Sequence, residues 1–297
     1  MQTFRTKLCQ VESTLEQAGV YCGHGYGSAA DEAVALVLGA AALAPEQPAS
    51  LLDRPFPEDA EAQLAELLDR RCEQRLPVAY CLQESYLAGL RFISDARALV
   101  PRSPVSHAVA ECLSPWWPAH RAPALIVDVC CGGGSLGLVA AEAFPGAMVL
   151  LSDLDQEALS LATENIILHE QSERVCAVRA DLTSVIRSGC VDILLANPPY
   201  VSRAEMAELP SEYSHEPRIA LEADAEGTEL AVRLLRDAVR VLAPDGLMLL
   251  EVGETWMTLE DRLPKVPFIW LELPQGGSGV AAISAQELRD WDAAGIL

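Results

Sequence analysis

The stretch Asn197-Pro-Pro-Tyr has the residue types needed to hold a planar NH2 group. The side-chain oxygen of Asn197 and the carbonyl of Pro198 can each accept one hydrogen from such a group, and Tyr200 can stack on the flat group that carries it. Pro198 and Pro199 lack backbone donors and fix the turn. Holding both N–H bonds turns the nitrogen lone pair toward an electrophile, which is most of what an in-line methyl transfer requires. A rigid turn at a strand edge is the alternative interpretation.

A second constellation, Asp128-Val-Cys-Cys-Gly-Gly-Gly, follows an apolar run and precedes a helical one. The loop residues in it are Cys130, Cys131, Gly132, Gly133 and Gly134. Glycines in such a loop let a nucleotide-like ligand press against the backbone, although a tight strand–helix turn would use the same residues. The spacing also differs from G-x-G-x-x-G. We expect Asp128 to order the loop by accepting backbone N–H bonds, and the two cysteines to be small packing residues.

Two carboxylates stand where later strands are expected to end. Asp153 follows the glycine loop by about 20 residues, at a position where a carboxylate can accept both hydroxyls of a ribose. Asp181 comes after the next strand and can accept a hydrogen bond from an adenine amino group, but a helix-capping role before Leu182 fits equally well. In the company of a cofactor loop and Asp153, the Asn197-Pro-Pro-Tyr stretch is better explained as an amide pocket than as a turn.

Alternating strands and helices from Ala124 onward would position these residues. Strands are expected at residues 124–129, 148–152, 175–179, 191–196, 247–252, 267–273 and 279–283. Continuous apolar strands alternating with helices indicate a parallel sheet that is covered on both faces. The last two strands are separated only by a Pro/Gly loop, so we expect them to be antiparallel.

The first 85 residues have a different, helical pattern. Leu8, Val11 and Leu15 recur at helical spacing, and a buried helix is expected after an Asp31 cap. An amphipathic helix is expected over residues 58–75. Two short apolar runs, 78–82 and 89–93, then predict a β-hairpin linker.

The composition limits the class of protein. With 21 Lys+Arg and 43 Asp+Glu among 297 residues, the formal net charge is −22, which argues against direct nucleic-acid binding and suits a basic partner. A hydrophobic fraction of 51% supports a packed core, yet no apolar run is long enough to span a bilayer, so we expect no membrane partner. Nine scattered cysteines without a C-x-x-C pair predict reduced thiols in a cytoplasm and no metal site.

Taken together, these motifs resemble those of the S-adenosylmethionine-dependent protein N5-glutamine methyltransferases, and within them the ribosomal protein L3 branch more than the release-factor branch. The resemblance covers nearly the whole chain. The stretches that carry it are Tyr21-Cys-Gly-His-Gly, Asp31-Glu-Ala, Leu99-Val-Pro-Arg-Ser-Pro-Val, Asp128–Gly134, Asn197-Pro-Pro-Tyr-Val, Leu209-Pro-Ser-Glu-Tyr-Ser-His-Glu-Pro, Leu250-Glu-Val-Gly and Gly276-Gly-Ser-Gly-Val. The Pro-Arg-Ser-Pro and Tyr-x-His-Glu-Pro segments are the more specific to that branch.

The resemblance implies an α/β fold: a Rossmann-like, seven-stranded class I methyltransferase domain with a β-hairpin linker over residues 86–297, preceded by an α-helical substrate-recruiting domain over 1–85. It implies methyl transfer from S-adenosylmethionine to the N5 side-chain amide of a glutamine, in a basic protein that would be ribosomal protein L3.

Carried over by position, the resemblance assigns roles to individual residues. The loop Cys130–Gly134 would lie along the methionine part of the cofactor, Asp153 would bind its ribose and Asp181 its adenine. The full cofactor set is Asp128, Cys130, Cys131, Gly132, Gly133, Gly134, Asp153, Leu154, Asp181, Leu182 and Asn197. Asn197, Pro198, Pro199 and Tyr200 would form the catalytic set around the glutamine amide. The sequence departs from the usual loop at Cys131 and at Gly133, where a small polar residue is common.

Other interpretations stay open at the level of sequence. The same chemistry would serve a release-factor glutamine or a small-molecule amine or amide, and a cofactor-binding assembly factor without turnover would keep the same fold. The intact Asn197-Pro-Pro-Tyr stretch argues against the last, because such a protein has no physical need of it. His215 and Glu216 are expected to brace a loop rather than act as bases, and Arg102 either steers an acidic group or forms a buried ion pair.

Overall fold

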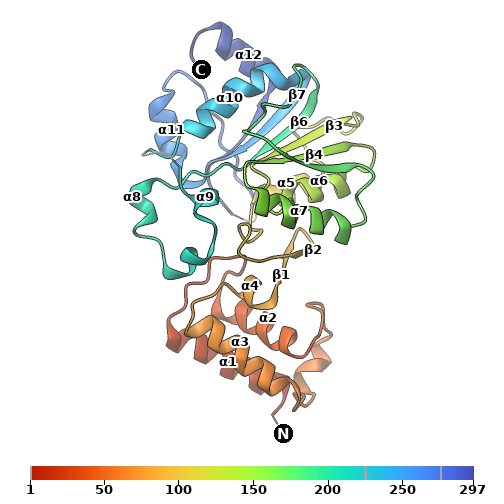
Figure 1. Ribbon diagram of the computed structural model, residues 1–297, viewed down its shortest axis with the longest axis vertical. Coiled ribbons are helices and arrows are strands. Elements are labelled where there is room, and N and C mark those ends of the chain that lie inside the picture. Colours follow the sequence, from red (N-terminus) through yellow and green to blue (C-terminus); the bar gives the residue numbers. More distant parts are fainter. Residues whose placement is uncertain (1, 224–225, 275) are drawn as a thin grey trace.

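A small group of helices at the N-terminal end is joined to a larger α/β domain by a two-stranded hairpin (Figure 1). The structure is a computed structural model and describes residues 2–223, 226–274 and 276–297. The elements before the α/β domain are α1 (Phe4–Ala18), α2 (Ala29–Ala40), the 3-10 helix η1 (Ala49–Asp53), α3 (Ala60–Cys72), α4 (Val78–Leu82), β1 (Glu84–Leu87) and β2 (Leu90–Ile93).

The helical part has its own apolar core, as the helical spacing predicts. Val11 and Leu15 of α1 are buried in it against α2 and α3, and Phe4 meets Phe56 edge to face at 5.2 Å. The N-cap of α2 differs from the prediction. Ser28 caps the helix by accepting a hydrogen bond from the Asp31 N–H, so Asp31 lies inside the first turn, where its charge still suits the helix dipole.

The hairpin linker is present, but its first strand is not the predicted one. Residues 78–82 form the short helix α4 after Pro77, a residue well suited to a helix start, and the strand β1 begins only at Glu84. β1 pairs antiparallel with β2, and the turn residues Ala88 and Gly89 both have positive φ (48° and 81°). That is the backbone of a type I′ hairpin turn. An apolar run of five residues is ambiguous between helix and strand, and here tertiary packing selects the helix.

The α/β domain contains one sheet of six strands in the order β5-β4-β3-β6-β7-β8. Its elements are α5 (Val105–Ala110), β3 (Leu125–Val129), α6 (Ser135–Ala143), β4 (Met148–Asp153), α7 (Gln156–Leu168), β5 (Val175–Arg179), β6 (Val191–Ala196), α8 (Arg203–Met206), η2 (Ser211–His215), α9 (Arg218–Leu221), α10 (Glu229–Val241), β7 (Leu242–Glu251), η3 (Gly253–Thr255), α11 (Trp256–Arg262), β8 (Val280–Ser284) and α12 (Ala285–Ala293). The strands β3 to β7 are parallel, and β8 runs antiparallel to β7.

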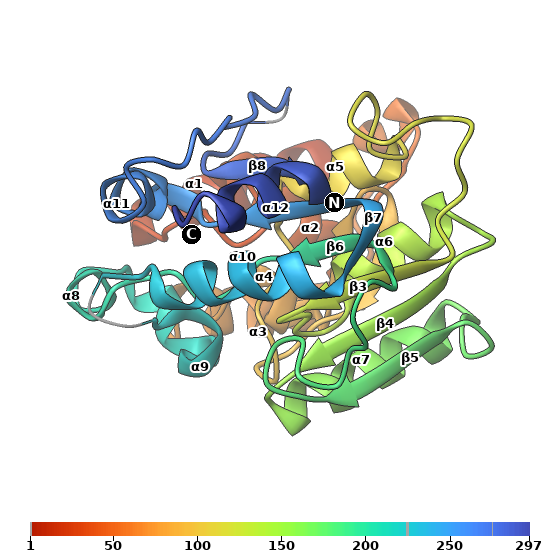
Figure 2. The same ribbon diagram turned by 90° about the horizontal axis from the view of Figure 1, so that it is seen from above.

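Both faces of this sheet are covered by helices (Figure 2). One face packs against α5, α6 and α7, and the other against α10, α11 and α12. The parallel sheet buried on two sides confirms the prediction from the apolar strands. The order also places a switch point between β3 and β6, from which successive strands proceed in opposite directions. In open α/β sheets, ligands bind at the carboxyl ends of the strands beside such a point.

The predicted seventh strand at residues 267–273 does not form within the part of the chain that the structure describes. Only one isolated bridge, Trp270 with Ala281, and one further hydrogen bond, from the Leu271 N–H to the Val280 carbonyl at 2.8 Å, connect this segment to β8. Both are consistent with the expected antiparallel direction. Pro267 and Pro274 flank the segment and cannot donate to a ladder, which limits its length. Among the described residues, no helix is long and apolar enough to cross a membrane.

Candidate active site

A cavity of about 200 Å³ lies at the carboxyl ends of β3, β4 and β6, and it collects almost all of the predicted site residues. Those on its wall are Asp128, Cys130, Cys131, Gly132, Gly133, Asp153, Leu154, Asp181, Leu182, Asn197, Pro198, Pro199 and Tyr200. Gly134 is not on the wall. It caps α6 with φ 79°, a left-handed conformation that favours glycine.

The glycine loop is shaped by a buried carboxyl at its start. Asp128 is 2% exposed and accepts a hydrogen bond from the Gly137 N–H at 2.8 Å, so it fixes the first turn of α6. Burial raises the pKa of Asp128 to about 7, against the lowering effect of that hydrogen bond. Cys130 and Gly132 both have positive φ (59° and 53°). The loop therefore turns sharply between β3 and α6 and brings its backbone to the cavity.

Asp153 connects this loop to the next strand. Its Oδ2 accepts the Gly132 N–H at 2.8 Å and its Oδ1 accepts the Asp155 N–H at 2.9 Å. Each carboxylate oxygen retains a second lone pair for a hydroxyl donor. Burial raises the pKa of Asp153, and three backbone N–H groups oppose that effect. The side chain thus both holds the loop and faces the cavity.

Asn165 of α7 also supports the loop, and the sequence analysis did not identify it. This residue is 1% exposed, and its Nδ2 donates to the Gly133 carbonyl (3.0 Å) and to the Ile93 carbonyl (3.2 Å). Its Oδ1 accepts the Ile93 N–H at 2.8 Å. The hairpin and the glycine loop are therefore tied to each other through one buried amide. A polar residue on the buried face of an apolar helix is the only sequence signal for it.

Asp181 is engaged by a cation on a neighbouring helix. Arg233 of α10 donates to both carboxylate oxygens, at 3.1 and 2.9 Å, and the two side chains are about half exposed. Exposed ion pairs of this kind contribute little and rearrange readily. The carboxylate lies on the wall of the cavity, and the capping role considered for it is not formed by its side chain.

The two cysteines of the loop are neutral thiols. Burial raises the pKa of Cys130 and of Cys131, and the nearby carboxylates of Asp153 and Asp128 raise it further. A thiol that does not ionise is neither a nucleophile nor a metal ligand. The residues act as small packing groups beside the carboxylates.

Asn197-Pro-Pro-Tyr directly follows β6 and is anchored to η3, the short 3-10 helix after β7. Thr255 donates to the Tyr200 carbonyl at 2.8 Å, and the Tyr200 ring lies on the backbone of Gly253. A Cβ at position 253 would come within 2.7 Å of that ring, so only glycine leaves room for it. Burial, followed by the charge of Glu251, raises the pKa of Tyr200 to about 12, which keeps its hydroxyl neutral.

Glu251, in the Leu250-Glu-Val-Gly segment, completes this wall and was not assigned a role from sequence. It is 5% exposed, accepts a hydrogen bond from Ser103 Oγ at 2.5 Å, and is also hydrogen-bonded by the side chain of Asn197. A carboxylate acceptor selects the NH2 end of Asn197, which leaves the Asn197 oxygen free for a substrate. Burial raises the pKa of Glu251 to about 7, although Ser103, Arg102 and Asn197 lower it. The sequence signal for a role of Glu251 was its position at the end of an apolar strand, which pairs with β6.

The loop after Asn197-Pro-Pro-Tyr is bound to the helical domain by buried charges. Glu216 accepts the Val100 N–H (2.9 Å) and both ends of the Arg102 guanidinium (2.5 and 2.8 Å), and His24 Nε2 lies 3.4 Å from it. Burial would raise the pKa of Glu216, but His24 and Arg102 outweigh it and lower the value to about 2. His215 contacts the Gln74 carbonyl at 2.8 Å.

A second carboxylate of this loop makes the same kind of contact. Glu212 accepts the Tyr21 N–H (2.9 Å) and an N–H of Arg71 (3.2 Å), which also forms a bidentate pair with Glu32. Together, Glu212, His215 and Glu216 brace the loop, and Arg102 forms the ion-pair alternative considered for it.

Comparison with known proteins adds a family assignment to this geometry. The family model described as "Methyltransferase small domain" matches residues 110–212. Three relatives are each described as "Ribosomal protein uL3 glutamine methyltransferase". The protein of Bordetella pertussis is 35% identical over 97% of this chain and 97% of its own, and that of Xylella fastidiosa 39% identical over 93% and 88%. The protein of Francisella tularensis is 32% identical over 97% and 92%.

Solved structures support the fold alone. The hMettl16 catalytic domain, in complex with the MAT2A 3′UTR hairpin 6, matches with a TM-score of 0.52 at 15% identity, over 77% of this chain and 83% of that one. The two sequences are too different to compare their substrates. The match agrees with the Rossmann-like arrangement of the sheet described above.

Proposed function

The chain belongs to the family of ribosomal protein uL3 glutamine methyltransferases, and we propose that it transfers a methyl group from S-adenosylmethionine to the side-chain amide of a glutamine in ribosomal protein uL3. The observation that carries this proposal is the pairing of Asn197 and Pro198 with Tyr200 on the wall of the cavity that also contains Asp153 and the glycine loop. Two acceptors beside an aromatic ring match the two N–H donors of a primary amide.

The residues of the cavity fit S-adenosylmethionine by their chemistry. Asp153 can accept a ribose hydroxyl in addition to its hydrogen bonds from backbone N–H groups, and the glycines of the loop leave the backbone uncovered by side chains. Asp128 and Asp153 give this end of the cavity an acidic character suited to a cationic ligand. Asp181 and Leu182 would hold the adenine, and Leu154 would line the ribose. When bound, the cofactor supplies an electrophilic methyl group on a sulfonium sulfur.

The catalytic residues of the chain position and desolvate the nucleophile. Glu251 fixes the amide of Asn197, whose oxygen then accepts one substrate N–H while the Pro198 carbonyl accepts the other. Tyr200 stays neutral and covers the flat face of the amide. Alignment of this kind is the main source of acceleration, because a methylated amide nitrogen releases its proton to water without a dedicated base.

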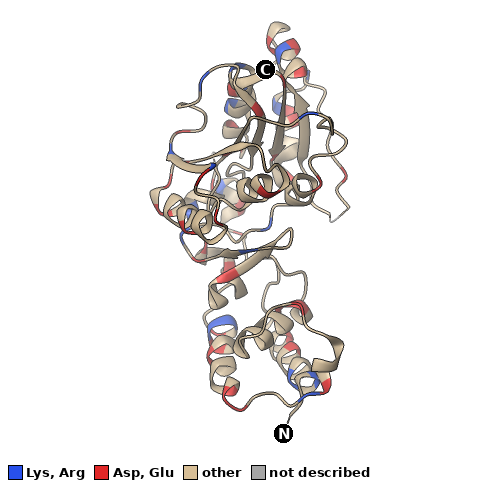
Figure 3. Cartoon of the chain, turned by 90° about the vertical axis from the view of Figure 1, so that its right-hand side faces the viewer, with Lys and Arg blue, Asp and Glu red and all other residues tan. Residues whose placement is uncertain are grey.

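The charge of the chain supports a basic protein as the partner. Acidic side chains are present on the helical domain, the hairpin and the α/β domain, and they outnumber Lys and Arg (Figure 3). A net charge of −22 raises the encounter rate with a cationic protein and repels free nucleic acid. The cysteines are free thiols, as is usual for proteins of the cytoplasm, and this supports a cytoplasmic location.

The test is a side-by-side methylation assay. Ribosomal protein uL3 and a release factor are each incubated with the enzyme and S-adenosylmethionine, with a glutamine-replaced version of each as control, and intact mass is measured. We expect a single methyl added to uL3 that depends on its glutamine. Preferential labelling of the release factor, or labelling that survives replacement of the glutamine, contradicts the proposal.

A further inference from the structure

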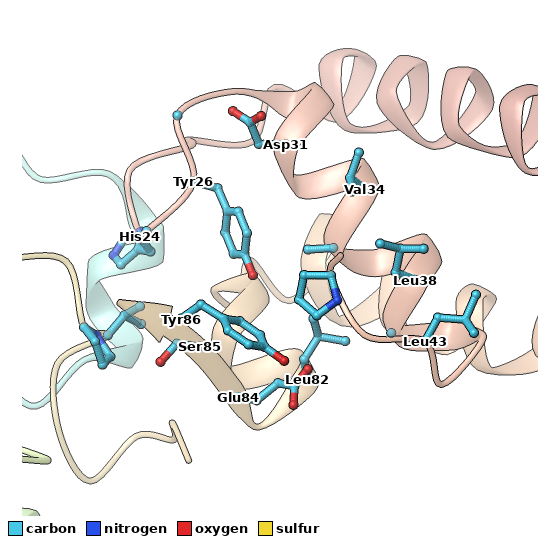
Figure 4. A pocket seen from close by; sticks show the side chains of 17 residues that line it. His24, Tyr26, Asp31, Val34, Leu38, Leu43, Leu82, Glu84, Ser85 and Tyr86 are labelled. Atoms are coloured by element: carbon cyan, nitrogen blue, oxygen red, sulfur yellow. The ribbon is translucent and has the colours of Figure 1, made fainter. Parts of the chain in front are cut away.

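A second cavity, of about 390 Å³, lies outside the active site, between α2 and β1 (Figure 4). We call it the α2–β1 pocket. Tyr26 enters it from the loop before α2 and Tyr86 from the hairpin, while Val34 and Leu38 of α2 form an apolar side. Val34 is 43% exposed and Tyr86 39%, which is unusual for side chains of their size and leaves apolar surface open to a partner.

The α2–β1 pocket adjoins the active-site cavity, and the two share part of a wall. Val100 and Pro101 line both cavities. They precede Arg102 and Ser103, which contact the loop after the catalytic motif and Glu251. A protein segment that places a glutamine in the active-site cavity therefore has neighbouring residues within reach of this second cavity.

The charges on the wall favour a cation. The charged side chains that line the pocket are Asp31 and Glu84, and no Lys or Arg is among its lining residues. Arg91 pairs with one oxygen of Glu84 at 3.2 Å in a partly exposed contact, which leaves the other oxygen available. Burial raises the pKa of Tyr26 to about 12, and the charge of Glu84 adds to this. Neutral aromatic rings beside a carboxylate are a recurrent environment for guanidinium and ammonium groups.

We propose that the α2–β1 pocket binds an Arg or Lys side chain of the protein substrate, close to the glutamine that is methylated. The proposal deepens the proposed function and rests on it. The aliphatic stem of the side chain lies along Val34 and Leu38, its charged end reaches Glu84, and the tyrosine rings flank it. An apolar side chain in the same place is the competing occupant.

The first test is a steady-state comparison on uL3. The double variant Glu84→Gln/Tyr86→Ala removes the carboxylate and one ring, and both residues are partly exposed, so the fold has little reason to change. We expect KM for uL3 to rise roughly ten-fold or more, with kcat and cofactor binding unchanged. Glu66→Gln, an exposed acid on α3 outside the pocket, is the matched control for loss of one negative charge. A KM within two-fold of the parent in the double variant overturns the proposal.

The second test does not depend on turnover. N-acetyl-arginine methylamide and N-acetyl-norleucine methylamide are titrated into the parent and into Glu84→Gln, and chemical shifts of the tyrosines are followed by NMR. We expect the arginine probe to shift the Tyr26 and Tyr86 signals in the parent and to bind Glu84→Gln more weakly. Stronger binding of the norleucine probe, or equal binding of the arginine probe to both proteins, rules out a cation site. Failure of the parent to methylate uL3 would refute the proposed function instead, and this titration would still decide the pocket.

Discussion

Replacing Glu251 by glutamine tests whether ionisation of this buried carboxyl makes the free energy of unfolding depend on pH. Burial raises the pKa of Glu251 from its ordinary value of 4.5 to about 7. An unfolded chain ionises this group near pH 4.5 and the folded chain near pH 7, so its contribution to stability is present below pH 4.5 and lost as the pH rises through 7. At about 1.36 kcal/mol for each pH unit, the loss is about 3 kcal/mol.

A glutamine side chain cannot ionise, so position 251 does not make the stability of the Glu251→Gln variant fall as the pH rises. The free energy of unfolding of the variant minus that of the parent should therefore rise between about pH 4.5 and pH 7 and level off above it. Urea titrations at a series of pH values from 4.5 to 8.5, without cofactor, measure the difference. Asp128, whose pKa is also about 7, is present in both proteins and cancels.

The way in which this difference in unfolding free energy changes with pH shows whether burial governs the ionisation of Glu251. Glu66→Gln, which changes an exposed carboxyl on α3, is the control for the loss of one negative charge. A flat difference for Glu251→Gln would refute the claim that burial governs its ionisation. A difference that falls with pH would mean that the partners Ser103, Arg102 and Asn197 stabilise the carboxylate more than burial destabilises it.

Three further predictions concern the site and the contact between domains. Asn197→Ala should lower kcat far more than it weakens cofactor binding, and Asn197→Asp should be milder because a carboxylate still accepts a hydrogen bond; single-turnover rates and calorimetry separate the two effects. Asp153→Ala should weaken binding of S-adenosylmethionine by about 1.5–3 kcal/mol for each charge-assisted hydrogen bond lost, measured by calorimetry. Arg71→Met should destabilise the fold by about 3–5 kcal/mol in urea titrations, because Glu32 is left buried without a cation and Glu212 keeps only the longer contact with Arg75, at 3.8 Å.

Each of these has an outcome that contradicts it. If Asn197→Ala turns over at the parental rate, Asn197 does not position the substrate amide for the reaction. Unchanged cofactor affinity in Asp153→Ala would show that Asp153 serves only the loop, through the Gly132 N–H. An Arg71→Met protein as stable as the parent would mean that the two glutamates find other partners or water.

Much of the α/β domain could be predicted because its signals are local. The strands β3, β4 and β6 lie inside the sheet and are largely buried on both faces, so their sequences are short apolar runs. The residues at their carboxyl ends follow from the same pattern, since parallel strands end at one edge. For this reason Asp128, Asp153 and Asn197 could be assigned to one site from the sequence.

The predictions from sequence failed for residues whose structure or role depends on contacts with residues distant in sequence. Residues 78–82 fit helix or strand equally well, and packing against α2 and α3 selects the helix. The segment 267–273 is as apolar as a strand, but its prolines leave it with one bridge to β8. Asn165 stands in an apolar helix without a motif around it, and the Leu250-Glu-Val-Gly motif does not say which partner Glu251 has. Only the fold shows that these two residues contact Gly133 and Asn197.

The loop that follows Asn197-Pro-Pro-Tyr connects the helical domain to the candidate site. Its carboxylates Glu212 and Glu216 have partners in the helical domain, among them the side chains of Arg71 and His24 and the backbone N–H of Tyr21. Removing residues 1–85 would therefore leave Glu212 without its cation and would disturb the loop next to the catalytic motif. A truncated enzyme that fails to methylate would not show which role was lost. Substitutions at Glu84 and Tyr86 of the α2–β1 pocket leave these carboxylates paired, so they are the changes that separate substrate capture from chemistry.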